Sequence, residues 1–118
     1  MTIETLPNKH RKRDYEVELE ALEFTSLCPL TGAPDFGTLT IRYVPGEALI
    51  ELKSLRDYLT SFRQRQILQE EVVNELLDEI VSSATPRFAE VEGFFNVRGG
   101  IEARVRAQIG VDPLDAQD

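Results

Sequence analysis

The sequence predicts an α+β domain whose elements follow the order β-β-α-α-β-β. Apolar and polar side chains alternate in two segments of the first half of the chain and in two near its end, as in half-buried strands. Between these pairs, apolar residues recur at helical spacing. We therefore expect an antiparallel four-stranded sheet with two helices packed on one face.

The first two strands are predicted on either side of a loop. Residues 15–22 alternate apolar side chains with glutamates, which indicates a strand. Residues 24–36 contain two prolines, a glycine and the only cysteine, Cys28, and are typical of a loop. Alternation returns over residues 37–43, and a Pro-Gly turn follows. We expect these two strands to be antiparallel.

Two amphipathic helices come next. A short extended piece around residues 49–52 leads to the first helix, for which Ser54 is the expected N-cap. The second helix begins with acidic residues and ends before Pro86. The apolar positions of the two helices are Leu55, Tyr58, Leu59 and Phe62, then Val72, Val73, Leu76, Leu77, Ile80 and Val81.

The last two strands form a hairpin. Residues 88–95 alternate, Gly99-Gly100 makes the turn, and alternation resumes after it. We predict a single domain over residues 1–118 with an ordered core of about 8–107 and flexible polar ends at 1–7 and 110–118. Such a sheet exposes two strand edges, so we expect them to be closed by oligomerisation.

Composition excludes several functional classes. The formal charge of -8 disfavours direct nucleic-acid binding, which needs clustered cations. The charged fraction of 29% leaves no stretch apolar enough to span a membrane. A single cysteine cannot form an intrachain disulfide, and the N-terminal residues lack a signal-peptide pattern, so we predict a cytoplasmic protein. One cysteine and one histidine are too few for the usual zinc sites, and no metal is expected.

Cys28 and Asp35 are the candidates for covalent chemistry. A single cysteine beside apolar neighbours is usually a small core residue. Cys28, however, is predicted in a loop, and the turn around Gly32 can bring its thiol and the Asp35 carboxyl into one pocket. The pair would combine a nucleophile with a proton donor.

The remaining candidates are charged residues. Glu70 starts the second helix, where it either complements the helix dipole or accepts hydrogen bonds from the N–H edge of a guanine-like ring. Lys53, Arg56 and Arg98 are either solvated surface charges or phosphate ligands. Neither glycine-rich nucleotide fingerprint occurs in the chain. A nicotinamide cofactor would therefore be held by side chains, between subunits.

Two longer motifs resemble those of the 7-cyano-7-deazaguanine reductases of queuosine biosynthesis. The first is their signature, Glu51-Leu52-Lys53-Ser54-Leu55-Arg56-Asp57-Tyr58. The second is their nucleophile loop, Phe24-Thr25-Ser26-Leu27-Cys28-Pro29-Leu30-Thr31-Gly32-Ala33-Pro34-Asp35-Phe36. The resemblance extends from Asn8 to Ile101 and points to the short, single-module branch of the family.

The resemblance implies a tunnelling fold that assembles into rings, here a decamer of two stacked pentamers with sites at subunit interfaces. It implies NADPH-dependent reduction of the nitrile of 7-cyano-7-deazaguanine to an aminomethyl group through a thioimidate on Cys28, with Asp35 as the general acid. The implied substrate-binding positions are Glu51, Ser54, Gln69 and Glu70. The implied NADPH-binding positions are Lys53, Arg56 and Arg98.

The chain departs from the family pattern at two positions. Gln69 stands where the family often has histidine, and can hydrogen bond but cannot transfer a proton near neutral pH. Arg56 stands where lysine is usual and keeps the positive charge. Two other functions stay open: an amidinotransferase acting on the same nitrile within tRNA, and a non-catalytic oligomer that binds purines.

Overall fold

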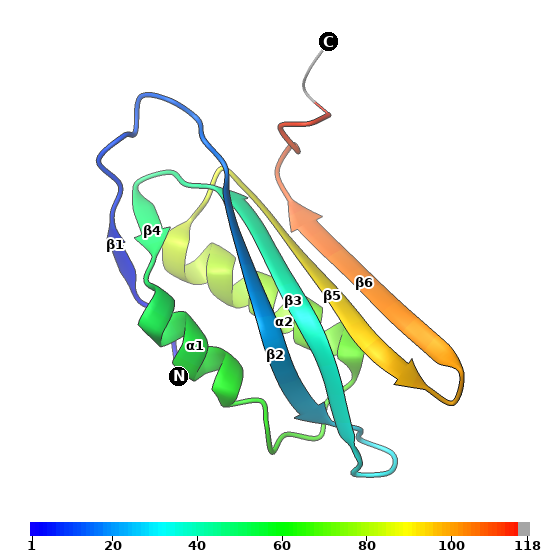
Figure 1. Ribbon diagram of the computed structural model, residues 1–118. Helices are drawn as coiled ribbons and strands as arrows, with labels where there is room; N and C mark the ends of the chain where they lie inside the picture. Colours follow the sequence, from blue (N-terminus) through cyan, green and yellow to red (C-terminus); the bar gives the residue numbers. More distant parts are fainter. Residues whose placement is uncertain (116–118) are drawn as a thin grey trace.

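The structure, a computed structural model, describes residues 1–115 and contains two helices and two antiparallel sheets (Figure 1). The elements are β1 (Thr5–Pro7), β2 (Val17–Leu27), β3 (Pro34–Val44), β4 (Ala48–Ile50), α1 (Leu52–Thr60), α2 (Gln69–Ala84), β5 (Phe88–Arg98) and β6 (Ile101–Ile109). The larger sheet has the order β2-β3-β5-β6, and β1 pairs with β4. The predicted fold class is confirmed, whereas the small β1-β4 sheet was not predicted.

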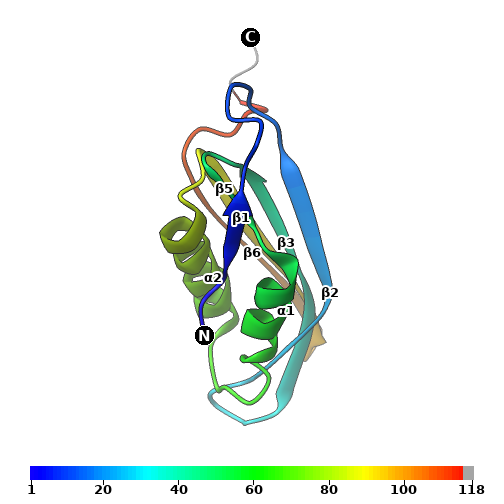
Figure 2. The ribbon, with the colours of Figure 1, turned by 90° about the vertical axis from the view of Figure 1, so that its left-hand side faces the viewer.

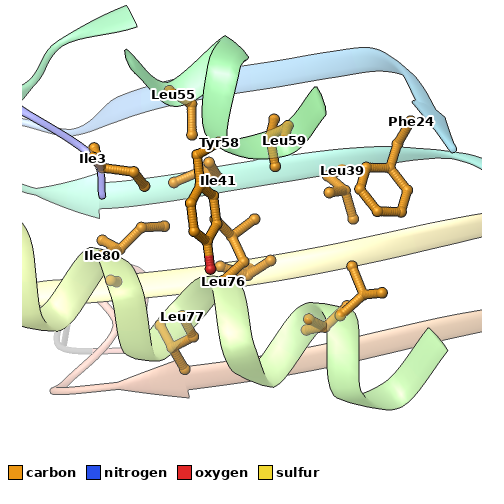
Figure 3. Close-up of a cluster of buried hydrophobic side chains, with 14 of the residues drawn as sticks. Ile3, Phe24, Leu39, Ile41, Leu55, Tyr58, Leu59, Leu76, Leu77 and Ile80 are labelled. Atoms are coloured by element: carbon orange, nitrogen blue, oxygen red, sulfur yellow. The ribbon is translucent and has the colours of Figure 1, made fainter. Parts of the chain in front are cut away.

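Both helices cover one face of the larger sheet (Figure 2). Strands and helices bury their apolar sides against each other, which removes that surface from water and forms the core. Figure 3 shows the centre of this core, where side chains of β3 meet those of α1 and α2. The core includes Leu39, Ile41, Leu55, Tyr58, Leu59, Leu76, Leu77 and Ile80. No helix within residues 1–115 is long and apolar enough to cross a membrane.

A β-bulge in β2 changes which side chains face the core. Ala21 lies opposite Leu39, but Phe24 lies opposite Gly37, so β2 carries one extra residue between these pairs. The bulge moves Phe24 and Ser26 onto the core face, where both are buried. The alternation of apolar and polar residues in the sequence therefore shifts by one position at the bulge. For this reason the predicted strand 15–22 ends too early, and β2 continues to Leu27.

The predicted loop over residues 24–36 is corrected by the same observation. The β2-β3 ladder continues until Leu27 pairs with Pro34, and the loop is only the hairpin tip, residues 28–33. Proline is tolerated at the first position of a strand, which explains how β3 can begin at Pro34. The shorter loop ties Cys28 and Asp35 to two paired strands.

The prediction of a flexible N-terminal tail over residues 1–7 is wrong. The side chain of Ile3 is only 4% exposed and belongs to the hydrophobic core. The Ile3 N–H donates to Glu79 Oε2 at 2.8 Å, and the Glu4 N–H donates to Ser54 Oγ at 2.8 Å. The buried Ile3 side chain and these two backbone hydrogen bonds thus anchor the N-terminus to the core and to both helices.

The C-terminal boundary also lies beyond the predicted residue 107. Strand β6 continues to Ile109, and the buried Asp112 pairs with Arg42, at 3.1 Å between Oδ1 and Nη2. Arg42 also pairs with Glu16 and Glu90, so this ion-pair network holds the segment after β6 against the sheet. The predicted flexible end 110–118 is corrected for residues 110–115, and residues 116–118 lie outside the described part.

Replacement of Ile3 by alanine tests the N-terminal anchor. We expect Ile3→Ala to lower the free energy of unfolding by about 2 kcal/mol, because it leaves a cavity in the core. Leu6→Ala is the control, since Leu6 is 52% exposed and should change the free energy by less than about 0.5 kcal/mol. Denaturant unfolding of both variants measures the difference. Equal effects would contradict the anchoring role of Ile3.

Candidate active site

The hairpin tip that carries Cys28 is closed by its own hydrogen bonds. The Cys28 N–H donates to Ala33 O, and the Gly32 N–H donates to Cys28 O, both at 2.8 Å. Gly32 has a φ of 73°, which glycine adopts without strain. Thr31 Oγ1 accepts the Ala33 N–H at 3.2 Å. Cys28, a half-buried residue, therefore lies on a loop with a defined backbone.

The surroundings of Cys28 favour its thiolate. The hydroxyl of Thr31 lowers the pKa of the thiol most, followed by the backbone N–H groups of Thr31 and Leu30. Partial burial opposes this effect, and the positive charge of Arg98 adds a small further lowering of the pKa. Since the thiolate is the nucleophilic form, the loop increases the reactivity of Cys28 at neutral pH.

Asp35 and Arg98 lie next to this loop. Asp35 is 8% exposed, and its Oδ1 is 3.3 Å from Arg98 Nη1. Arg98 Nη2 also donates to Pro34 O at 2.7 Å. Arg98 ends β5, which pairs with β3, so the sheet brings this residue to the start of β3. Cys28, Asp35 and Arg98 thus gather at one end of the sheet.

The start of α2 is held near the same end. The Leu27 N–H donates to Arg65 O at 2.8 Å, and the Ile67 N–H donates to Leu27 O at 2.9 Å. These bonds place the chain that enters α2 beside the end of β2. Gln69 is half-buried and Glu70 is exposed, and the Glu70 carboxylate has no hydrogen-bond or ion-pair partner within residues 1–115. Their contact with substrate stays a prediction.

Glu51 and Ser54 build the N-terminus of α1. The Glu51 carboxylate accepts the backbone N–H of Ser54 at 2.8 Å and of Lys53 at 2.7 Å, and these bonds lower its pKa. The predicted N-cap Ser54 is therefore corrected to Glu51. The Ser54 hydroxyl donates to Glu51 O and accepts the Glu4 N–H. Both side chains thus have structural contacts, and their predicted role in substrate binding is untested.

Two of the predicted cofactor cations lie on α1. Lys53 and Arg56 are exposed, and neither forms an ion pair with another residue of the described chain. Arg56 and Arg63 line an open groove of about 600 Å³ between α1 and β2. Glu18, Glu20 and Glu23 line the same groove, so its charge does not by itself identify a phosphate site, and the NADPH-binding role of Lys53 and Arg56 stays a prediction. Arg98, in contrast, lies with Asp35 at the sheet end.

Removal of the Thr31 hydroxyl should make Cys28 less acidic. We expect Thr31→Val to raise the thiol pKa, because the largest stabilising contact of the thiolate is lost. Alkylation by iodoacetamide should then be slower at neutral pH and should reach the wild-type rate only at higher pH. Leu30→Ala, which keeps the backbone donors, is the control. Superimposable pH profiles for Thr31→Val and wild type would contradict this role.

Thr31 received no role from the sequence, although it lies between the two predicted catalytic residues. The sequence did contain an indication of this role, since the hydroxyl group of a residue in a turn beside a cysteine can donate a hydrogen bond to the sulfur. The Arg98-Asp35 ion pair had no comparable signal. It depends on the register between β3 and β5, which local periodicity does not determine.

Comparisons with known proteins agree with these motifs. A family described as "QueF-like protein" matches residues 34–113. The NADPH-dependent 7-cyano-7-deazaguanine reductase of Anaeromyxobacter sp. (strain Fw109-5) is 49% identical over 111 residues, 94% of this chain and 91% of that protein. The enzyme of the same name from Thermomicrobium roseum is 48% identical over 106 residues, 90% of this chain and 83% of that protein.

A solved structure supports the fold. The chain described as "Crystal structure of the archaeosine synthase QueF-Like in the apo form" aligns with a TM-score of 0.77 at 26% identity, covering 83% of this chain and 96% of that one. Identity to the named reductases is markedly higher and covers nearly the whole chain. The chain thus belongs to the QueF-like family, which includes the NADPH-dependent 7-cyano-7-deazaguanine reductases.

Proposed function

We propose that this protein uses NADPH to reduce the nitrile of 7-cyano-7-deazaguanine to an aminomethyl group, with Cys28 as the covalent nucleophile. The main support is the hairpin tip, where a thiol of lowered pKa lies near a buried carboxyl. The names of relatives at 47–49% identity support the substrate and the cofactor. A catalytic free thiol suits a reducing compartment, and we propose a cytoplasmic location.

The first step joins Cys28 to the substrate. The thiolate sulfur forms a bond to the nitrile carbon, one π bond of the nitrile breaks, and its electron pair moves to nitrogen. Asp35, acting as general acid, gives its proton to that nitrogen. The product is a thioimidate, and no oxidant or reductant is consumed up to this point. This step is therefore measurable without NADPH.

The later steps need four electrons in total. NADPH, when bound, supplies them as two hydrides, and two molecules are used for each nitrile. Cys28 keeps the carbon attached until the first reduction is complete, then leaves as a thiolate that its loop stabilises. Its departure forms an imine, which the second hydride converts to the amine. Cys28 is unchanged at the end of the cycle.

Substrate binding is assigned to the start of α2. The free carboxylate of Glu70 suits two parallel hydrogen bonds from the N–H edge of the deazaguanine ring. Gln69 is a neighbouring amide that can donate or accept a hydrogen bond. We also propose Glu51 and Ser54 as substrate contacts. Their side-chain oxygens already bond to the first turn of α1, so they would contact the substrate through hydrogen bonds additional to those of the helix cap.

The cofactor assignment predicts separable half-reactions. We expect Lys53→Ala and Arg56→Ala each to raise the Michaelis constant for NADPH about tenfold, because each removes a charge-assisted contact to phosphate. Adduct formation between Cys28 and the nitrile should be unchanged. Lys12→Ala removes one exposed positive charge elsewhere and is the control. Unchanged constants in both test variants would move the NADPH site away from α1.

We also propose that complete sites form between subunits of a decamer built from two stacked pentamers. Apart from the bridge between Leu27 and Gln66, the outer edges of β2 and β6 have no pairing partner within residues 1–115 and are available to neighbouring copies. The start of α1, the helix that carries Lys53, lies away from the hairpin tip of the same chain (Figure 1). A neighbouring copy could supply the missing cations. Light scattering should give the mass of ten chains, and a monomer mass would overturn the assembly.

One experiment distinguishes the candidate functions. Purified protein is mixed with 7-cyano-7-deazaguanine and NADPH, and the absorbance of NADPH is followed. Oxidation of two NADPH for each nitrile supports the reductase. The likeness to an archaeosine synthase keeps an amidinotransferase as the second candidate. That activity would leave NADPH unchanged and consume the nitrile within tRNA in the presence of ammonia. Binding without either reaction would indicate a non-catalytic purine-binding protein.

A further inference from the structure

Ser26 has an unusual environment in the core. Ser26 is 0% exposed. In the described part of the chain, its Oγ is the one buried side-chain polar atom that has no hydrogen-bond partner. A buried hydroxyl without a partner costs about 1–3 kcal/mol. Alanine at this position would avoid that cost and fill nearly the same space. Stability alone therefore does not explain a serine here.

The β2 bulge directs Ser26 towards Asp35. Ser26 lies directly opposite Asp35 in the β2-β3 ladder, and opposite residues of antiparallel strands point to the same face with Cβ atoms about 4.5–5.5 Å apart. Asp35 is also buried and makes no side-chain hydrogen bond within residues 1–115. Its one polar side-chain contact in the described part of the chain is the ion pair with Arg98. Two complementary buried groups thus face each other without being bonded.

The ion pair with Arg98 accounts for this arrangement. Asp35 Oδ1 lies 3.3 Å from Arg98 Nη1, so the carboxyl group is directed towards Arg98 rather than Ser26. A protonated carboxyl has no charge for Arg98 to attract. The Ser26 hydroxyl, which lies opposite Asp35 in the β2-β3 ladder, is then available to an oxygen of the carboxyl group.

We propose that Ser26 is a positioning residue for Asp35, binding its carboxyl group in the protonated state that delivers the proton to the nitrile. This inference rests on the proposed function, in which Asp35 is the general acid. The Ser26 hydroxyl donates to the carbonyl oxygen of the acid, which orients the carboxyl plane and leaves its O–H free. The proton moves from Asp35 to the nitrile nitrogen. Ser26 keeps its own proton, and the carboxylate returns to Arg98.

The first test combines stability with adduct formation. Ser26→Ala removes an unpaired buried hydroxyl, so we expect an equal or higher melting temperature. We expect the same variant to form the Cys28 adduct about tenfold more slowly, measured by intact-protein mass spectrometry without NADPH. Ser26→Thr, which keeps a hydroxyl but adds a methyl group to a fully buried site, should retain more of the rate than Ser26→Ala. A purely structural serine would not show this opposite pair of effects.

The second test asks whether Ser26 acts through Asp35. In an Asp35→Asn background the carboxylic acid is absent, so Ser26→Ala should cause no further loss of rate. Ser83→Ala is the matched control, because Ser83 Oγ donates to Glu79 Oε2 at 2.6 Å on the far part of α2. We expect it to lower the melting temperature slightly and to form the adduct at the wild-type rate.

The outcomes separate the two proposals. If wild-type protein forms no adduct with the nitrile, the proposed function fails. If wild type forms the adduct and Ser26→Ala matches its rate, the function stands and the role of Ser26 is overturned. A clearly lower melting temperature for Ser26→Ala, or additive effects with Asp35→Asn, would also overturn that role.

Discussion

Cys28→Ala should abolish both the covalent adduct and NADPH oxidation. Cys28 is the only cysteine of the chain, so no other thiol can replace it. Its side chain is half-buried at a hairpin tip and contributes little to the core, so the fold should be kept. We expect the mass of wild-type protein to increase by one substrate after mixing with the nitrile, and the mass of the variant to stay constant.

The single cysteine also makes the measurement specific. Prior alkylation of wild-type protein should block the mass increase, because the reagent can modify no other thiol. Circular dichroism of Cys28→Ala serves as the control for folding. Residual turnover of the nitrile by a well-folded Cys28→Ala protein would exclude covalent catalysis by this residue.

Asp35→Asn should slow adduct formation by about 10²–10⁴-fold, the usual contribution of a general acid or base. The amide of asparagine can hydrogen bond to the nitrile nitrogen but cannot supply the proton that the thioimidate requires. Substrate affinity should change much less. The rise of thioimidate absorbance in stopped flow gives the rate, and equilibrium binding of the substrate to the Cys28→Ala and Cys28→Ala/Asp35→Asn proteins gives the affinities.

Asp78→Asn provides the comparison for a lost carboxylate. Asp78 is exposed on α2, so its replacement should leave adduct formation unchanged.

The ion pair between Arg98 and Asp35 leads to a further prediction. Arg98→Ala frees Asp35 from its ion-pair partner, and it should affect adduct formation as well as NADPH binding. Wild-type adduct formation in Asp35→Asn would remove Asp35 from the acid role.

Local patterns predicted most of the fold. Alternation identified the strands β2, β3, β5 and β6, and helical spacing identified α1 and α2, because both periods follow from backbone geometry over a few residues. The errors occurred where contacts distant in sequence decide the structure. Ile3 gave no periodic signal, yet its burial in the core orders the N-terminus.

The candidate site shows the same division. Residue types in a turn-rich segment indicated a thiol nucleophile and a nearby acid. The motif resemblance indicated Glu70 as a substrate-binding residue, and it indicated the cations that bind NADPH, which are Lys53, Arg56 and Arg98. Only strand register brings Arg98 to Asp35, since these residues lie on separate hairpins. The contact between Ser54 and Glu4 likewise depends on how the N-terminus crosses α1.

By itself, the sequence determined the class of fold, the order of its main elements and the chemical groups available for covalent catalysis. Those properties depend on backbone periodicity and side-chain chemistry, which are local. The tertiary structure alone decided where β2 ends, which face Ser26 occupies, and that Arg98 pairs with Asp35. A one-residue bulge and the register of paired strands set these positions, and both arise from long-range pairing that no single segment encodes.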